Sequence, residues 1–188
     1  MNSVPQGEPL PLVHLRFPLV GDAEALFPLI HRTAVTDTIA WDGPESLEAY
    51  RLWIESRAAQ IASGEPHFRI VVETASSRPV GCAGLRPKPD RAVADFGLWI
   101  GEPFQGRGYG GEVVRLLLVE GFAVLGLDAI EATVFVGNQA SRRAMERNAM
   151  RLDATLADAL IKRGRPVDLW RFTISREEWE QGGRGTRM

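Results

Sequence analysis

A glycine-rich segment near the middle of the chain has the composition of an anion-binding loop. It reads Gln105-Gly106-Arg107-Gly108-Tyr109-Gly110-Gly111, with four glycines in six residues, and it separates an apolar run from an apolar helical pattern. Glycines leave a loop without bulky side chains, so backbone N–H groups can approach a ligand. The start of a helix adds N–H groups without acceptors and a positive dipole end. This arrangement is typical of a pyrophosphate-binding site.

A dinucleotide is one ligand to consider for such a loop. Gly106, Gly108 and Gly111 satisfy the G-x-G-x-x-G pattern, and Glu131 follows 20 residues after the last of them. In dinucleotide-binding folds the strand runs directly into the first glycine, and the acidic residue ends the next strand. Here five residues including Pro103 intervene, and Glu131 lies near the start of the next predicted strand. The spacing therefore disfavours a dinucleotide.

Composition limits the classes of function. The chain has 188 residues, 45% of them hydrophobic and 24% charged, which suits one domain with a sizeable core. A net charge of −2 gives no basic field for nucleic acid. Cys82 is the only cysteine, which excludes a disulfide framework, and His14, His31 and His67 lack ligand spacing, so we expect no metal. Without a leader-like or long apolar segment, we expect a cytoplasmic protein that binds no membrane.

Hydrophobic periodicity predicts an α/β (α+β) domain over residues 10–175, with flexible ends at 1–9 and 176–188. Three consecutive strands with short connections favour an antiparallel meander, and the helix after the glycine loop leads to a strand parallel to residues 95–100 through a right-handed crossover. We expect a mixed, mostly antiparallel sheet of about seven strands and about four helices. The strands are predicted at 12–17, 68–73, 79–86, 95–100, 129–136, 151–162 and 166–174, and the helices at 22–34, 47–61, 110–125 and 139–148.

Two motifs carry a resemblance to a known family. The segment from Gln105 to Gly110 resembles the Q-x-x-G-x-G acyl-CoA loop of the GNAT N-acetyltransferase superfamily, and the order of elements agrees. More narrowly, the chain resembles the RimJ and RimL branch, which acetylates ribosomal-protein N-termini. That likeness rests on residues 108–113, on residues 138–146 and on the ending from Gly164 to Asp168, and it extends more loosely over residues 10–175.

The resemblance implies a GNAT-type domain that uses acetyl-CoA as its acyl donor and needs no metal. The pantetheine arm would pair like an extra strand with Leu98, Trp99 and Ile100, in a cleft between the two parallel strands. Backbone N–H groups there would stabilise the oxyanion, and those of the glycine loop would bind the pyrophosphate. Arg107 is either a phosphate ligand or an exposed loop arginine. The implied donor-binding residues of the loop are Gln105, Gly106, Arg107, Gly108, Tyr109, Gly110 and Gly111.

The resemblance also implies roles in catalysis. Many family members protonate the departing thiolate with a tyrosine seven residues after the asparagine that is here Asn138, but this chain has Met145 there. Methionine has no proton to donate. Ser141 is then the expected thiolate donor, and Asn138 the expected contact to the pantetheine or the sulfur. Both residues also suit helix capping, a role compatible with these.

The amine acceptor is the least defined part. Trp41 is either a packing residue or a wall of the substrate cleft, and Asp42 beside it is a candidate contact. Asp37, Asp95 and Asp168 are further carboxylates that could hold an amine, although each suits a cap, a turn or a surface charge. A protein N-terminus and a small molecule remain open as acceptors, as does a homodimer.

Two other functions stay open. The chain could be a non-catalytic acyl-CoA-binding or sensing module, which Met145 makes worth considering, or it could transfer a larger acyl group such as succinyl. One departure bears on the acceptor side. The family follows the helix after Asn138 with Gly-Phe, where this chain has Ala149-Met150. A positive φ at Ala149 would cost stability.

Overall fold

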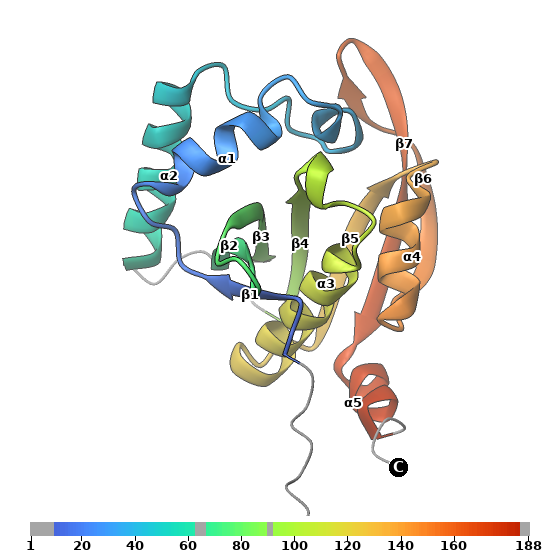
Figure 1. The fold of residues 1–188 in the computed structure, drawn as a ribbon. Helices are drawn as coiled ribbons and strands as arrows, with labels where there is room; N and C mark the ends of the chain where they lie inside the picture. Colours follow the sequence, from blue (N-terminus) through green and yellow to red (C-terminus); the bar gives the residue numbers. More distant parts are fainter. Residues whose placement is uncertain (1–9, 63–66, 90–91, 185–188) are drawn as a thin grey trace, which may run out of the picture.

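The predicted strands form one mixed sheet in the order β1-β2-β3-β4-β5-β7-β6 (Figure 1). The computed structural model describes residues 10–62, 67–89 and 92–184. β2, β3 and β4 form the predicted antiparallel meander, and β1 pairs antiparallel with β2. β4 and β5 are parallel, and β7 pairs antiparallel with both β5 and β6, which confirms the expected α/β (α+β) GNAT-type sheet. The strands are β1 (Val13–Arg16), β2 (His67–Glu73), β3 (Pro79–Pro87), β4 (Val93–Ile100), β5 (Ala129–Phe135), β6 (Arg151–Lys162) and β7 (Arg165–Ser175).

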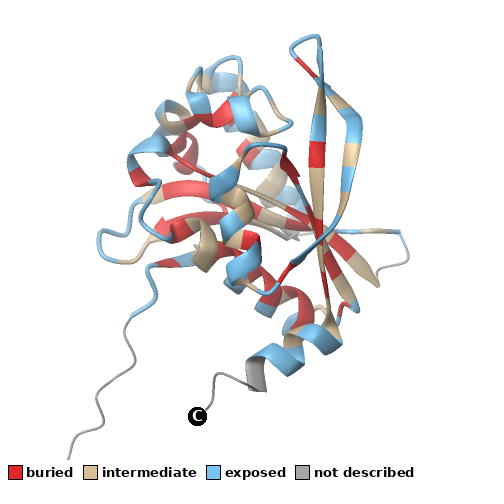
Figure 2. Ribbon diagram, turned by 90° about the vertical axis from the view of Figure 1, so that its right-hand side faces the viewer, coloured by how far each residue is buried: buried red, intermediate tan, exposed pale blue. Residues whose placement is uncertain are grey.

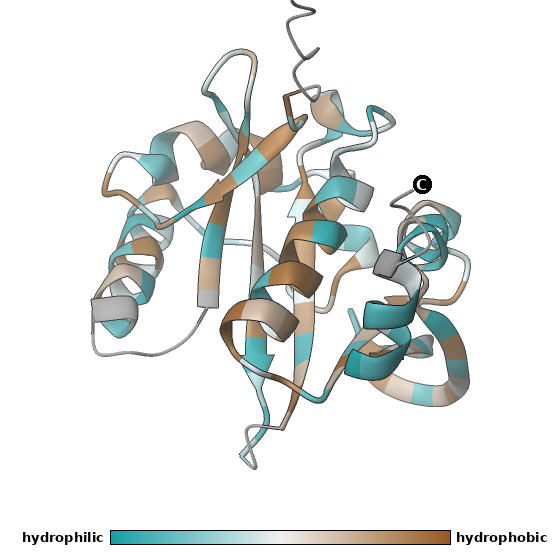
Figure 3. Cartoon of the chain, turned by 90° about the horizontal axis from the view of Figure 1, so that it is seen from below, coloured by the Kyte–Doolittle hydropathy of each residue, from teal (hydrophilic) through white to brown (hydrophobic). Residues whose placement is uncertain are grey.

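Helices pack against both faces of the sheet, because strand side chains alternate between the faces. α1 (Asp22–Ile30) and α2 (Leu47–Ala62) bury Leu26 and Tyr50 on the face that carries Cys82. α3 (Tyr109–Val119) covers the face that carries Leu85 and Phe96. In Figure 2 many of the buried segments, drawn in red, lie along the strands that these helices cover. In Figure 3 α3 is largely brown, or hydrophobic, whereas α4 (Gln139–Arg147) and α5 (Arg176–Arg184) are mostly teal, or hydrophilic. No helix in the described ranges is both long and apolar enough to cross a membrane.

The two parallel strands separate halfway along their length. β4 and β5 are in register from Val93 opposite Ala129 to Phe96 opposite Ala132, and the pairing ends there. Beyond this point both strands continue, to Ile100 and Phe135. The β5-facing edge of β4 is therefore unpaired after Phe96, and unpaired strand edges present backbone N–H and C=O groups to another extended chain. The cleft expected between the parallel strands is present at this position.

The helix after the glycine loop differs slightly from its predicted bounds. Gly108 has the left-handed φ of 86° and precedes the first helical residue, Tyr109. The last turn, Glu120–Val124, is π-helical rather than α-helical. Gly121 lies in that turn, where an added Cβ would come within 2.5 Å of the Ile130 side chain on β5. The wider turn thus contains a glycine where the helix approaches the sheet most closely.

Two other predicted boundaries are wrong. The first helix ends at Ile30 rather than near Ala34, and the loop expected from Val35 to Pro44 begins with the 3-10 helix Ala34–Thr38. The 176–188 tail was expected to be flexible, but Arg176–Arg184 form α5. Its Trp179 ring lies 5.2 Å from the Phe122 ring, a long-range contact that periodicity does not reveal. Residues 1–9 and 185–188, also expected to be flexible, lie outside the described residues.

The turn after α4 places a non-glycine residue in the left-handed region. Ala149 has a φ of 60°. Its N–H donates to the Glu146 carbonyl at 3.1 Å, and the Met150 N–H donates to the Met145 carbonyl, also at 3.1 Å. This is the Schellman hydrogen-bond pattern, in which glycine is the usual residue at the Ala149 position. The turn therefore forms with Ala149-Met150 in place of the family's Gly-Phe, and the cost is backbone strain at the exposed Ala149.

Replacing Ala149 with glycine should stabilise the protein. Left-handed backbone costs an L-residue roughly 1–2 kcal/mol, and the greater freedom of glycine in the unfolded chain offsets part of the relief. We expect the free energy of unfolding of Ala149→Gly, measured by urea denaturation, to rise by about 0.5–1 kcal/mol. The control Ala59→Gly, at an exposed position of α2, should lower it by about 1 kcal/mol. Destabilisation by Ala149→Gly would contradict this account of the turn.

Candidate active site

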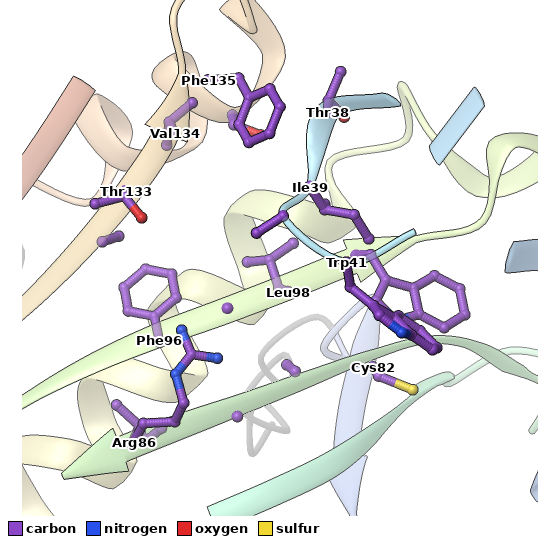
Figure 4. Close-up of a pocket in the computed structure, with 18 of the residues that line it drawn as sticks. Thr38, Ile39, Trp41, Cys82, Arg86, Phe96, Leu98, Thr133, Val134 and Phe135 are labelled. Carbon is purple, nitrogen blue, oxygen red and sulfur yellow. The ribbon is translucent and has the colours of Figure 1, made fainter. Parts of the chain in front are cut away.

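Two cavities meet where β4 and β5 separate. The first, of about 380 Å³, has walls rich in aromatic side chains, among them Trp41, Trp53 and Phe96; we call it the aromatic cavity (Figure 4). The second, of about 500 Å³, is lined by the glycine loop and the start of α3; we call it the glycine-loop cavity. Two ligands, one bound in each cavity, would therefore meet at the gap between β4 and β5. The residues that line both cavities are Thr38, Ile39, Leu98, Trp99, Asn138, Ser141 and Met145.

The glycine loop presents a run of free backbone donors. Gln105 donates its backbone N–H to the Glu102 carbonyl, but none of the N–H groups of residues 106–111 has a backbone acceptor among the described residues. Gly106 has a φ of 75°, and a Cβ added at Gly106, Gly110 or Gly111 would meet nothing within 4 Å. Open space thus lies beside N–H donors at the N-terminus of α3, an arrangement suited to a pyrophosphate.

Hydrogen bonds fix this loop to the sheet. The Gln105 side-chain amide donates to the Ile100 carbonyl at 2.8 Å, at the end of β4. The Tyr109 hydroxyl donates to the Glu73 carboxylate on β2 at 2.5 Å. Arg107 lies 3.6 Å from the same carboxylate and over the Phe104 ring, and it does not line the glycine-loop cavity. Of the predicted loop residues, Arg107 is the one that the structure leaves outside.

Asn138 and Ser141 combine capping with free polar groups. The Asn138 side-chain oxygen accepts a hydrogen bond from the Ser141 N–H at 3.1 Å, which confirms the predicted N-cap of α4. Neither the Asn138 amide NH₂ nor the Ser141 hydroxyl has a partner among the described residues, and both residues are half-buried at the junction of the two cavities. Two neutral donor residues therefore lie where ligands bound in the two cavities would meet.

The position expected of a tyrosine proton donor is apolar. Met145 is 4% exposed, packs in the core and lines both cavities. Tyr50 lies elsewhere, with its hydroxyl 3.8 Å from the Cys82 sulfur in the core under α2. Burial raises the pKa of the Cys82 thiol, so this lone cysteine stays protonated at neutral pH and serves packing.

Trp41 and Asp42 have different surroundings. The Trp41 ring is stacked 5.5 Å from the Trp53 ring and lines the aromatic cavity, so it is both a packing residue and a cavity wall. Asp42 does not line that cavity. Its carboxylate is 2.5 Å from the Lys162 ammonium at the tip of the β6–β7 hairpin, and this ion pair holds the pKa of Asp42 below its usual range. The Lys162 ammonium also donates to the Trp41 carbonyl at 3.0 Å.

The other candidate carboxylates have structural partners as well. Asp37 pairs with Arg163 of the hairpin tip at 2.7 Å, and Asp95 pairs with Arg86 at 2.5 Å. Asp168 accepts a hydrogen bond from the Asp158 N–H at 2.9 Å, which fixes an irregular part of the hairpin. Within the described ranges, no carboxylate lines the aromatic cavity.

Sequence reasoning missed the cations around the site. Arg57 and Arg86 line the aromatic cavity, and Arg143 and Arg147, one turn apart on α4, line the glycine-loop cavity. The i, i+4 spacing of the last two was a readable signal. Arg57 gave none, because its position at the cavity depends on how α2 packs over the sheet.

Known proteins share this architecture. A family model described as an acetyltransferase (GNAT) domain matches residues 13–151. YoaA, an uncharacterized N-acetyltransferase of Bacillus subtilis, is 28% identical over 157 residues, which cover 81% of this chain and 87% of YoaA. Spermidine N-acetyltransferase from Vibrio cholerae, solved with CoA and spermine, is 19% identical, with a TM-score of 0.78 and coverage of 90% of this chain and 98% of that one. RimL, a ribosomal L7/L12 alpha-N-protein acetyltransferase solved with coenzyme A, is 20% identical, with a TM-score of 0.77 and coverage of 87% and 94%.

The fold and the site together define an acetyltransferase. The family match runs from β1 to the first residue of β6 and therefore includes the glycine loop, the separated parallel strands and α4. The chain belongs to the GNAT acetyltransferase family, and its class of activity is N-acetyl transfer. At these identities the solved structures support the fold and leave the acceptor open.

The contact between Tyr109 and Glu73 gives a pH-dependent prediction. Hydrogen bonds from Ser76 and then Tyr109 lower the pKa of Glu73. Tyr109→Phe should raise that pKa, which carboxyl NMR titration would measure. A carboxyl group whose pKa is lowered by folding stabilises the fold when the pH is above its unfolded-state pKa. This stabilisation is lost as the pH falls through the folded-state pKa. The variant should therefore be less stable than wild type at pH 7, with the difference vanishing in acid.

Ser76→Ala is the matched control for Tyr109→Phe, because it removes the other hydroxyl on the same carboxylate. It should raise the pKa of Glu73 at least as much. An unchanged Glu73 pKa in Tyr109→Phe would contradict the contact that fixes the start of α3.

Proposed function

We propose that this protein is an acetyl-CoA-dependent N-acetyltransferase that transfers the acetyl group directly to a primary amine in a ternary complex. The observation that carries the proposal is the junction of two cavities at the gap between β4 and β5. One cavity has the free N–H groups suited to the CoA pyrophosphate, and the other has room for an acceptor. The CoA ligands of the similar solved structures support the assignment of the donor.

The unpaired edge of β4 would position the thioester. An extended pantetheine arm can bind backbone groups of Leu98–Ile100, on the same edge of β4 that pairs with β5 as far as Phe96. A backbone N–H there would stabilise the negative charge on the carbonyl oxygen as the amine attacks. Arg143 and Arg147 add positive charge beside the phosphates.

Transfer then needs one bond made and one broken. The neutral amine nitrogen attacks the carbonyl carbon, the C–S bond breaks, and its electron pair leaves on sulfur. Ser141 donates its hydroxyl proton to the thiolate and recovers a proton from solvent, while the amine nitrogen releases its own proton to water. The Asn138 amide would donate to the sulfur or the pantetheine. Since no carboxylate or imidazole of the described residues lines the aromatic cavity, the acceptor itself must reach the neutral form through solvent.

The acceptors named for similar proteins belong to more than one chemical class. The relatives include enzymes whose names specify a ribosomal protein and a polyamine, so a RimJ- or RimL-like role on protein N-termini is one form of this proposal. Location in the cytoplasm and assembly as a homodimer remain predictions from the sequence. A non-catalytic acyl-CoA-binding module and a larger acyl donor are outcomes that the following experiment separates.

Binding and transfer should be measured on the same preparation. Calorimetry should detect acetyl-CoA binding, and thiol release should follow the addition of amines, with product masses read by mass spectrometry. Gly106→Ala should weaken acetyl-CoA binding, because its methyl group enters the space over the loop donors. Gly126→Ala is the control, since it also has a positive φ and open surroundings but lies outside both cavities.

No binding at millimolar acetyl-CoA would contradict the proposal. Binding without transfer across a broad panel of amines would instead favour the non-catalytic module. Turnover with succinyl-CoA but not acetyl-CoA would identify a larger acyl donor by the mass of the product.

Substitutions at Ser141 and Asn138 separate catalysis from capping. Ser141→Ala should lower kcat by about 10²–10⁴-fold with little change in acetyl-CoA affinity. Asn138→Asp keeps the capping oxygen but removes the amide donor, so it should weaken donor binding or turnover at nearly unchanged stability. Asn138→Ala should in addition lose about 1 kcal/mol of stability. Unchanged turnover in Ser141→Ala would remove Ser141 from the mechanism.

A further inference from the structure

The floor of the aromatic cavity is bare where two glycines lie opposite each other. Phe68 on β2, Gly84 on β3 and Gly97 on β4 form one row across the sheet, on the face that α1 and α2 cover. Gly84 and Gly97 line the cavity, which therefore reaches the backbone of the sheet. Gly97 directly precedes Leu98–Ile100, the segment along which the thioester is proposed to lie. Whatever lies over Gly97 is thus next to the reacting amine.

The guanidinium of Arg86 lies over that floor. Arg86 is on β3, and one of its terminal nitrogens would be 3.2 Å from a Cβ added at Gly97. Figure 4 shows this side chain extending from β3 toward β4 and Phe96. The other terminal nitrogen pairs with Asp95 at 2.5 Å. The absence of a side chain at position 97 leaves room for the guanidinium beside the transfer point.

A second guanidinium lines the wall of the cavity. Arg57 on α2 lies over the Trp53 ring, with its guanidinium carbon 5.2 Å from the ring centroid. Its Nε is buried without a hydrogen-bond acceptor, and no ion pair of Arg57 is found within the described ranges. Burying a polar group without a partner costs free energy, and a guanidinium is the preferred protein ligand of carboxylate and phosphate groups. An anion in the cavity would supply the missing partner.

The charged side chains that line the cavity have one sign. Among the described residues that line it, Arg57 and Arg86 are charged and no acidic residue is present. The nearby carboxylates are already paired, Asp95 with Arg86 and Asp37 and Asp42 with the hairpin tip. Such a cavity disfavours a polyamine, because its ammonium groups would lie beside two guanidinium groups, with no carboxylate among the described lining residues and with Asp95 already paired with Arg86. It favours an acceptor whose amine is accompanied by a negative group.

We propose that the acceptor of this enzyme is a small primary amine that carries a carboxylate or phosphate group a few bonds from the nitrogen, bound by Arg57 and Arg86. The inference rests on the proposed function and names its substrate class. The aromatic walls, with Trp41 and Trp53 stacked and Phe68 edge-on to Trp53, fit an apolar body on the same molecule. An amino acid with an apolar side chain has this combination of groups.

The first test measures anion recognition without any reaction. Calorimetry would compare 3-phenylpropionate with its neutral amide, each titrated into the CoA-saturated protein. We expect the carboxylate to bind at least tenfold tighter, and Arg57→Gln/Arg86→Gln to remove this preference. Arg51→Gln is the matched control, because it is on the same helix but pairs with Glu24 away from the cavity. It should retain the preference.

The second test measures kcat/KM for matched acceptors. Phenylalanine should exceed phenethylamine and phenylalaninamide at least tenfold, and spermidine should be poorer still. 1-Amino-2-phenylethylphosphonate separates a phosphate-type anion from a carboxylate, and a peptide with an acidic N-terminal residue tests a protein acceptor.

The outcomes of the two tests distinguish this proposal from the proposed function. Equal use of charged and neutral amines, preference for spermidine, preference for the peptide, or an anion preference that survives Arg57→Gln/Arg86→Gln would overturn the acceptor class while leaving N-acetyl transfer intact. Binding of 3-phenylpropionate that depends on the two arginines, in a protein that acetylates no amine, would instead contradict the proposed function alone.

Discussion

The end of backbone pairing between β4 and β5 is the feature on which the rest of the site depends. After Phe96 and Ala132 the two strands are no longer in register, although each continues for three or more residues. Backbone groups left without a partner strand need other partners, and an extended ligand can supply them. The same separation leaves the gap in which the two cavities meet. One change in strand geometry therefore supplies both a binding edge and a passage between donor and acceptor.

The elements around this gap were predictable from the sequence where local chemistry decides them. The glycine loop, the parallel strand after its helix and the Asn138 cap each follow from residue types within a few positions, because φ preferences, alternation and side-chain capping act locally. Long-range packing decides the features that were missed. α5 depends on Trp179 reaching Phe122, and the π-helical turn contains Gly121 against Ile130 of β5.

Ala149 shows how a departure from a family pattern can be accommodated. The backbone keeps the Schellman hydrogen bonds, and Met150, which follows, is buried at 2% exposure. Since burial of Met150 and the position of β6 both depend on this turn, the packing that they provide holds Ala149 at a φ of 60°. The alanine therefore strains the turn, and β6 and β7 still pair antiparallel after it.

The charge of the aromatic cavity depends on contacts between distant parts of the chain. Asp42 is adjacent in sequence to Trp41, a cavity wall, which made it a reasonable candidate for holding an amine. The partner that removes it from that role is Lys162, whose ammonium also binds the Trp41 carbonyl, 121 residues away in sequence. Lys162 and Arg163 pair with Asp42 and Asp37, and Asp95 pairs with Arg86. Arg57 is therefore the charged lining residue for which no ion pair is found within the described ranges. The closing hairpin thus contributes to the electrostatics of the site without lining it with charge.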